Sequence, residues 1–188
     1  AAAARWLLRN NLAAYCAAFR IPDAIFQLVA AGALSSALIP VLAGLHAAEE
    51  EQRAWRVVAT VVNLMLLALL ALSVVVALAA PVLIPLVTPG FDAVETELTV
   101  RLSRVMLLSP ILLALGAVAT SVLNARGRFA ASAVAPLLYN VVIILAAVLL
   151  APTLGVDGLA IGVVLGSLAH LAVQLPAIVR LPSFGYDF

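Results

Sequence analysis

VVATVVNLMLLALLALSVVVALAAPVLIPLVTPGF, residues 57–91, runs without a single charged side chain. Within it, residues 64–87 are apolar except for Ser73. A helix needs about 20 apolar residues to cross the hydrocarbon core of a bilayer. Lipid offers no hydrogen-bond partner to a peptide group, so such a segment has to satisfy its backbone internally. The stretch is therefore predicted to be a transmembrane helix.

Four further segments repeat this pattern, so we predict an all-α, polytopic transmembrane bundle with about five membrane helices. Pro22 interrupts the first segment, because proline lacks an amide hydrogen and disfavours helix in the residue before it. We expect a short half-helix before Pro22 and a longer one from Asp23 to about Leu45. The four segments cover residues 12–45, 98–124, 129–150 and 157–179.

Composition supports the same class. Hydrophobic residues make up 66% of the chain and charged residues 10%, and the mean hydropathy is +1.23. All ten basic residues are arginine, the net charge is +1, and Cys16 is the single cysteine. The sequence contains no pattern typical of an enzyme site, a phosphate-binding glycine loop or a metal site. We expect neither catalytic residues nor a cofactor, a metal or a nucleic-acid partner.

Basic residues alternate between the loops. Residues 46–56, 125–128 and 180 carry arginine, whereas the connections 88–97 and 151–157 carry acids and no base. The positive-inside rule therefore places the first three regions in the cytoplasm. The chain opens AAAARW without a methionine, and we expect it to be an internal piece of a longer protein.

The last segment carries small residues four apart, at Gly158, Gly162 and Gly166, followed at the same spacing by His170. Small residues at this spacing let two helices approach closely in lipid, so we interpret the glycines as a helix-packing stripe. A leucine at Gly162 should disturb it, whereas a leucine at Val163 should be close to neutral. His170 is either a polar residue bonded to a neighbouring helix or part of a proton or ion relay.

Three arginines lie next to or within the apolar segments. Arg20 sits beside Pro22, and Arg101 and Arg104 lie one turn apart near the outer end of the third segment. Each either extends toward lipid headgroups or faces a wet cavity, where a guanidinium can bind phosphate through two parallel hydrogen bonds.

Six strings carry a specific resemblance when taken together: AFRIPD (18–23), AGALSSALIPVL (31–42), PGFD (89–92), LNARGRFA (123–130), APLLYN (135–140) and QLPA (174–177). In order and spacing they closely resemble the MurJ/MviN family of lipid II flippases. The resemblance implies the two-lobed, MATE-like fold of the multidrug/oligosaccharidyl-lipid/polysaccharide exporter superfamily. Residues 1–188 would form one transmembrane domain, part of the N-terminal lobe, and the C-terminal lobe would be supplied by the rest of the chain.

The implied function is alternating-access flipping of lipid II, the undecaprenyl-diphosphate-linked peptidoglycan precursor used in cell-wall synthesis. The expected location is the bacterial plasma (inner) membrane, and the expected partners are this glycan lipid and the surrounding membrane lipids. Arg20 and Arg104 fit basic positions of the family pattern. Together with Asp23 and Arg101, they are our candidate substrate-binding residues.

The chain departs from the family pattern at positions where family members carry charges tied to headgroup binding. Ala13, Phe26, Gln27 and Ala31 stand at those positions here. The departures leave two alternatives open. One is a transporter of different cargo, either another polyprenyl-linked glycan or a drug exchanged for a cation. The other is a membrane scaffold that has lost transport.

Overall fold

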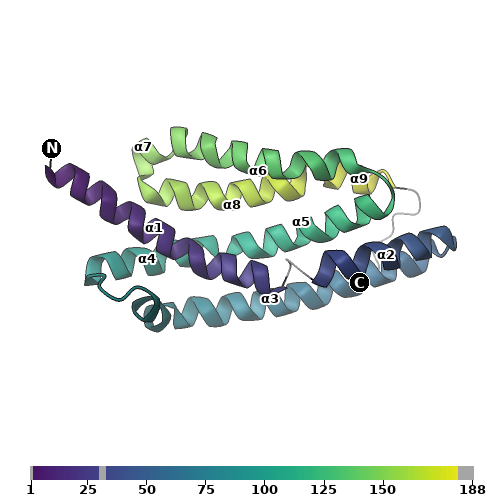
Figure 1. Cartoon of the computed structure of the whole chain (residues 1–188), viewed down its shortest axis with the longest axis horizontal. Coiled ribbons are helices and arrows are strands. Elements are labelled where there is room, and N and C mark those ends of the chain that lie inside the picture. The colour runs from purple at the N-terminus through teal and green to yellow at the C-terminus, as the bar shows by residue number, and fades with distance from the viewer. Residues whose placement is uncertain (1, 30–32, 182–188) are drawn as a thin grey trace.

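The computed structural model describes the backbone of residues 2–29 and 33–181, and the side chains of residues 11–27 and 37–181. Helices account for nearly all of these residues (Figure 1). Their bounds are α1 Ala2–Val29, α2 Ala33–Ala47, α3 Glu51–Val87, α4 Ala93–Met106, α5 Leu108–Ala125, α6 Phe129–Leu149, α7 Ala151–Leu154, α8 Val156–Ala172 and α9 Leu175–Val179.

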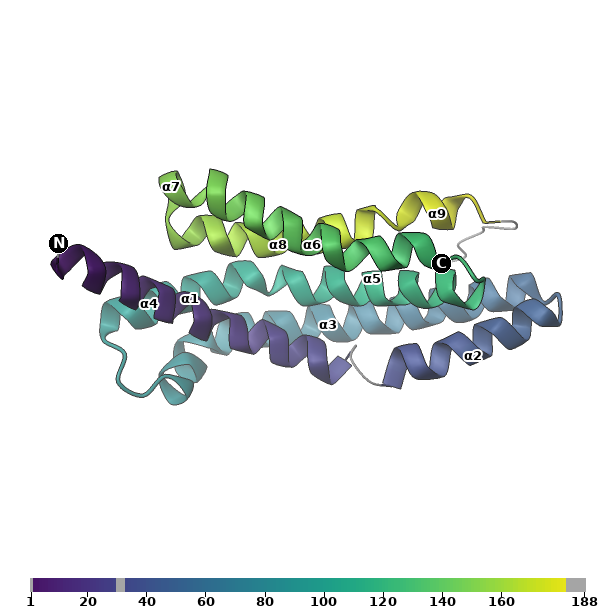
Figure 2. The same ribbon diagram turned by 45° about the horizontal axis from the view of Figure 1, so that its top comes forward.

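Within the described residues, four helical stretches are long and apolar enough to cross a membrane. They are α3, α4 together with α5, α6, and α8 together with α9. These four match the second to fifth predicted segments, and the fold class is confirmed: a multi-pass helical bundle. The first predicted segment corresponds to α1 and α2, which follow one another along the long axis of the bundle (Figures 1 and 2).

The predicted break at Pro22 is wrong, because α1 continues through Pro22 to Val29. Proline at position 22 removes the amide hydrogen that would normally reach the carbonyl of Ala18, four residues earlier. The hydroxyl of Ser103 on α4 donates to that same carbonyl at 3.3 Å. A donor from a neighbouring helix thus replaces the missing backbone bond, and the helix can continue in lipid.

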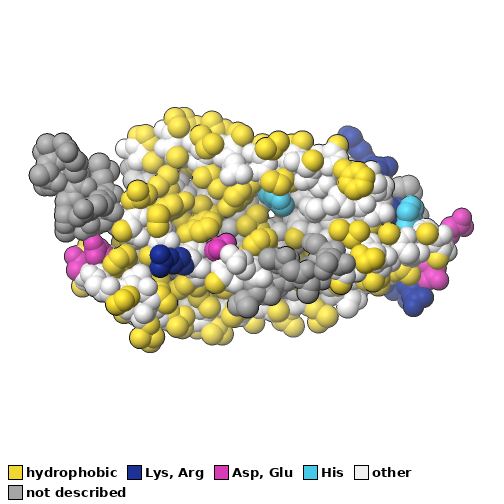
Figure 3. Space-filling model, in the orientation of Figure 1, with side chains coloured by type: hydrophobic (Ala, Val, Ile, Leu, Met, Phe, Trp, Pro, Cys, Tyr) yellow, Lys and Arg dark blue, Asp and Glu magenta, His cyan; other side chains and the backbone are white. Residues whose placement is uncertain are grey.

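Helix α5 occupies the centre of the bundle. It contacts α1, α2, α3, α4, α6, α8 and α9, and Figures 1 and 2 both show it between the α6–α8 pair and α3. Ala114 and Leu123 on α5 are fully buried. The outer helices expose apolar side chains instead. Figure 3 shows a face covered largely by hydrophobic groups, with most charges toward its two ends and one basic and one acidic group between them. This is the surface expected of a protein solvated by lipid.

The loops group at two ends, as the charge pattern predicts. The α2–α3 and α5–α6 connections lie at one end, and the α3–α4 connection and α7 lie at the other (Figure 1). At the first end, the guanidinium of Arg126 pairs with the carboxylate of Glu51, which also contacts Nδ1 of His46 at 2.5 Å. At the second end, Arg101 pairs with Asp157 at 2.8 Å. Each ion pair therefore ties together helices that meet at the same end.

The three glycines of α8 lie against α6 and the residues that follow it. A Cβ added to Gly162 would lie 2.6 Å from the Cβ of Ala146, and one added to Gly166 would lie 2.9 Å from the carbonyl oxygen of Tyr139. For Gly158 the nearest atom would be the carbonyl carbon of Leu150, at 2.8 Å. Two helices approach this closely only where one of them lacks side chains.

Val163 differs from the sequence-based expectation, which made a leucine there close to neutral. The side chain is 1% exposed and belongs to a core cluster with Leu102 and Met106 of α4. A larger side chain would overpack this cluster. The face of α8 next to the glycines is therefore a second packing face.

We predict that Gly162→Leu lowers the melting temperature of the full-length protein in detergent, because the added side chain occupies space filled by Ala146. Overpacking of this kind costs about 1–3 kcal/mol. Ala172→Leu, at an exposed position of the same helix, is the matched control and should leave the melting temperature unchanged. Equal melting temperatures for Gly162→Leu and wild type would show that the α6–α8 contact is not tight.

We also predict that position 52 is cytoplasmic and position 94 is extracytoplasmic. Both side chains are exposed, at Gln52 and Val94, near opposite ends of the bundle. Single cysteines there, in a Cys16→Ser background, are treated with a membrane-impermeant thiol reagent on spheroplasts. Position 94 should be labelled at once, and position 52 only after the membrane is permeabilised. The reverse pattern would invert the topology.

Candidate functional site

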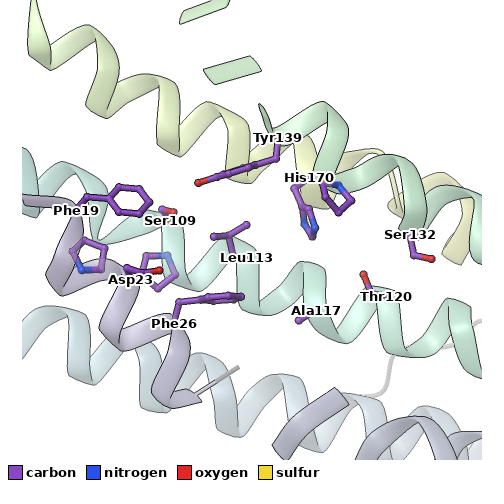
Figure 4. A pocket seen from close by; sticks show the side chains of 13 residues that line it. Phe19, Asp23, Phe26, Ser109, Leu113, Ala117, Thr120, Ser132, Tyr139 and His170 are labelled. Carbon is purple, nitrogen blue, oxygen red and sulfur yellow. The ribbon is translucent and has the colours of Figure 1, made fainter. Parts of the chain in front are cut away.

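An open cleft of about 460 Å³ lies between α1, α5, α6 and α8. Figure 4 shows side chains from these helices turned toward one space. On α5 the lining runs from residue 109, the midpoint of the span Ala93–Ala125, to Thr120. The cleft therefore extends from the middle of the membrane toward the end of the bundle that carries the α5–α6 connection. Its lining residues are Phe19, Pro22, Asp23, Phe26, Ser109, Pro110, Leu113, Ala117, Thr120, Ser132, Pro136, Tyr139 and His170.

The lining is mostly apolar and aromatic. Phe19 and Phe26 on α1 and Tyr139 on α6 contribute three aromatic rings. Asp23 is the one charged residue among the lining residues of the described chain. Its carboxylate accepts a hydrogen bond at 2.7 Å from the side-chain amide of Gln27, one turn along α1. The cleft therefore combines aromatic faces with one carboxylate and a few hydroxyls.

The candidate arginines lie outside this lining. Arg20 is exposed on α1, three residues before Asp23, and forms no hydrogen bond or ion pair within the described part of the chain. Arg101 lines a separate hollow at one end of the bundle, where it pairs with Asp157. Of the four candidate substrate-binding residues, only Asp23 faces the cleft directly, and Arg20 lies closest to it along the helix.

Arg104 has a structural contact. Its Nε donates to the carbonyl oxygen of Ala77 on α3 at 3.0 Å. Pro81, four residues after Ala77, removes the amide that would otherwise bond this carbonyl. Arg104 therefore replaces a missing backbone hydrogen bond of α3, as Ser103 does for α1.

His170 projects from α8 toward α5 (Figure 4). Its ring occupies the space left by Gly116, since a Cβ there would lie 2.4 Å from Nδ1. A relay would need a second titratable group beside His170. Nδ1 has no hydrogen-bond partner in the described part of the chain, and Asp23 is the only acid among the lining residues.

Buried polar groups bridge α5 to α8 beside the cleft. Ser167 donates to Ser109 at 2.8 Å. The side-chain amide of Gln174, which is fully buried, donates to the carbonyls of Gly116 at 3.3 Å and His170 at 3.0 Å. Its oxygen accepts from Thr120 at 2.9 Å. Every hydrogen-bonding atom of the Gln174 side chain is therefore used in joining the two helices.

Several of these residues escaped the sequence analysis. Phe19 and Tyr139 were visible only as parts of family-like strings, and Phe26 only as a departure from the pattern. Gly116 stands alone in an apolar stretch, with no repeat to mark it. Its role depends on His170, more than fifty residues later, so no local pattern could reveal it.

Comparison with known proteins gives a consistent result. The family model described as "Lipid II flippase MurJ" matches residues 9–182. A Burkholderia cenocepacia protein named lipid II flippase MurJ is 34% identical over 172 residues, covering 89% of this chain and 33% of the relative. A Vibrio cholerae protein named probable lipid II flippase MurJ is 32% identical over 172 residues, covering 86% of this chain and 33% of the relative.

A solved structure described as "Lipid II flippase MurJ, inward closed conformation" has a similar fold. The TM-score is 0.75 at 24% sequence identity, over 93% of this chain and 37% of that one. The chain thus spans about a third of the length of the curated relatives it matches.

We predict that Arg104 and Pro81 are energetically coupled. Arg104→Met removes the donor to the Ala77 carbonyl and should destabilise the full-length protein by about 1–2 kcal/mol. In a Pro81→Ala background the restored amide can bond that carbonyl, so the same Arg104→Met change should cost less. Thermal unfolding of the four proteins of the cycle in detergent measures the coupling. Strictly additive effects would show that the Arg104 contact does not replace the missing backbone bond.

Proposed function

Because the chain belongs to the MurJ family, we propose that it forms part of the N-terminal lobe of a lipid II flippase in a bacterial inner membrane. The cleft between α1, α5, α6 and α8 would be this lobe's half of a central cavity, and the rest of the full-length protein would supply the other half. Transporters of this general kind bind their substrate near the bilayer midplane and expose the site alternately to either side. The extension of the cleft to the middle of a span carries the proposal.

The polar groups of α1 suit a headgroup that has both neutral and anionic parts. Asp23 faces the cleft, where its carboxylate can accept hydrogen bonds from hydroxyl or amide groups. Arg20 lies three residues earlier on the same helix and carries no ion pair within the described residues. A diphosphate would be repelled by Asp23 and attracted by Arg20. We propose that this pair of opposite charges orients the headgroup, with its diphosphate toward Arg20.

The cross-helix bonds from α4 suggest how the lobe would move. Ser103 and Arg104 tie α4 to α1 and α3, and Gln174 ties α8 to α5. Breaking these bonds within lipid would leave polar groups without partners. We therefore propose that the described helices move as one body during transport, and that α1 does not hinge at Pro22.

We predict that Arg20→Ala weakens headgroup binding by about 1.5–3 kcal/mol, roughly ten- to a hundredfold, because a charge-assisted contact is lost. Arg20→Lys should restore part of the loss, since an ammonium keeps the charge but not the paired donors of the guanidinium. The measurement is growth of a flippase-depleted strain that carries full-length wild type or a variant, with protein levels in the membrane checked.

Arg56→Ala is the matched control, because Arg56 is exposed near the start of α3, a helix that contributes no residue to the lining of the cleft. It should support growth as wild type does. Growth with well-expressed wild type and equally with Arg20→Ala would remove Arg20 from the site. Failure of well-expressed wild type to support growth would argue against lipid II and in favour of other cargo or a scaffold.

A further inference from the structure

The imidazole of His170 packs against α5 and also lines the cleft. Nδ1 is buried and has no hydrogen-bond partner in the described chain. It lies close to the backbone of Gly116 on α5, because a Cβ added there would clash with Nδ1 and Cε1 of the ring. The ring therefore fills the space that the missing side chain of Gly116 leaves on α5.

This contact decides which ring nitrogen carries the proton. In place of a Cβ, Gly116 directs a Cα hydrogen toward Nδ1. A lone pair on Nδ1 can accept this weak C–H contact, whereas an N–H there would point at another hydrogen. A neutral imidazole has one N–H and one bare nitrogen. Of the two neutral tautomers, the one with its proton on Nε2 fits this contact.

Nε2 is the nitrogen that remains open to the cleft. The ring lines the cleft, and of its two nitrogens only Nδ1 is both buried and without a partner. The imidazole of His170 forms no hydrogen bond within the described residues. The cleft thus receives an N–H donor that no protein acceptor uses.

The helix contact beside this donor is held by a network of hydrogen bonds around Gln174. The Gln174 side chain donates to the carbonyls of both His170 and Gly116, and so joins the two contact residues through one amide. Thr120 holds the oxygen of that amide at 2.9 Å. A donor held in place before its ligand arrives loses little entropy on binding.

We propose that His170 contacts the transported lipid directly, donating its Nε2–H to an acceptor oxygen on the glycan part of the headgroup. This inference rests on the proposed function. The surroundings favour the glycan over the diphosphate, because the lining carries three aromatic rings and one carboxylate, Asp23, which repels phosphate. Aromatic faces attract the C–H groups of sugar rings, and hydroxyl oxygens accept N–H donors.

The test measures binding of two probes to the full-length protein in detergent: lipid II, and undecaprenyl diphosphate without a glycan. His170→Phe keeps a ring of similar shape but removes the donor, and should lower affinity for lipid II roughly three- to tenfold. Affinity for undecaprenyl diphosphate should not change. His170→Gln, which offers an amide donor at a similar reach, should bind lipid II better than His170→Phe.

Gly116→Ala provides a second variant that leaves the histidine in place. Its methyl group displaces the ring, so lipid II binding should fall as in His170→Phe, and the double variant should be no weaker than either one. Melting temperatures check that each variant is folded. The nitrogen chemical shifts of ¹⁵N-labelled histidine in wild type should show Nε2 protonated.

Unchanged lipid II binding in both His170→Phe and Gly116→Ala would overturn the inference while leaving the proposed function standing. An equal loss for both probes would move the donor to the diphosphate and overturn the glycan assignment. If wild type binds neither probe, the proposed function fails and this inference fails with it.

Discussion

A carbonyl that a proline frees inside the bilayer is costly to leave unpaired, because lipid supplies no donor. Two such carbonyls, on Ala18 of α1 and Ala77 of α3, receive donors from residues that are adjacent in sequence, Ser103 and Arg104. One turn of α4 therefore supplies the missing hydrogen-bond donors of two helices. Helix α4, which has four charged residues among its fourteen, thus keeps two of its neighbours continuous, and the α1 wall of the cleft depends on that continuity.

Polar groups are also paired within the protein where α8 crosses α5 and α6. Glycines bring the backbones close, and the polar side chains near the crossing bond to one another or to carbonyls, as Ser167 and Gln174 do. Polar groups used this way are not available to a ligand. What remains in the cleft is Asp23 on α1, the hydroxyl of Tyr139 on α6 and the open edge of His170 on α8, facing a lining that is otherwise mostly aromatic and aliphatic. A small number of unused polar groups in an apolar cleft is typical of ligand sites.

The spans and the grouping of loops could be predicted because long apolar runs have a single solution in lipid and because arginine marks one side. The break at Pro22 was predicted wrongly for a physical reason. Whether a proline ends a membrane helix depends on whether another helix offers a donor, and Ser103 lies some eighty residues away. The roles of Val163 and Gly116 could not be predicted for the same reason, since they are set by partners on other helices. Spacing along one helix reported which residues share a face, but not which neighbour that face meets.

The charges of the cleft also indicate which part of a headgroup each of the two lobes of a flippase would bind. In the described residues, this wall offers one carboxylate and no arginine to a bound headgroup, while Arg20 is exposed on α1, three residues before Asp23. Arg101 and Arg104 are engaged by Asp157 and the Ala77 carbonyl. Under the proposed function, a diphosphate would therefore need most of its counter-charge from the rest of the protein. The headgroup would then lie across the two lobes, with its glycan against the aromatic wall described here, so that a change in the angle between the lobes would act on both of its ends.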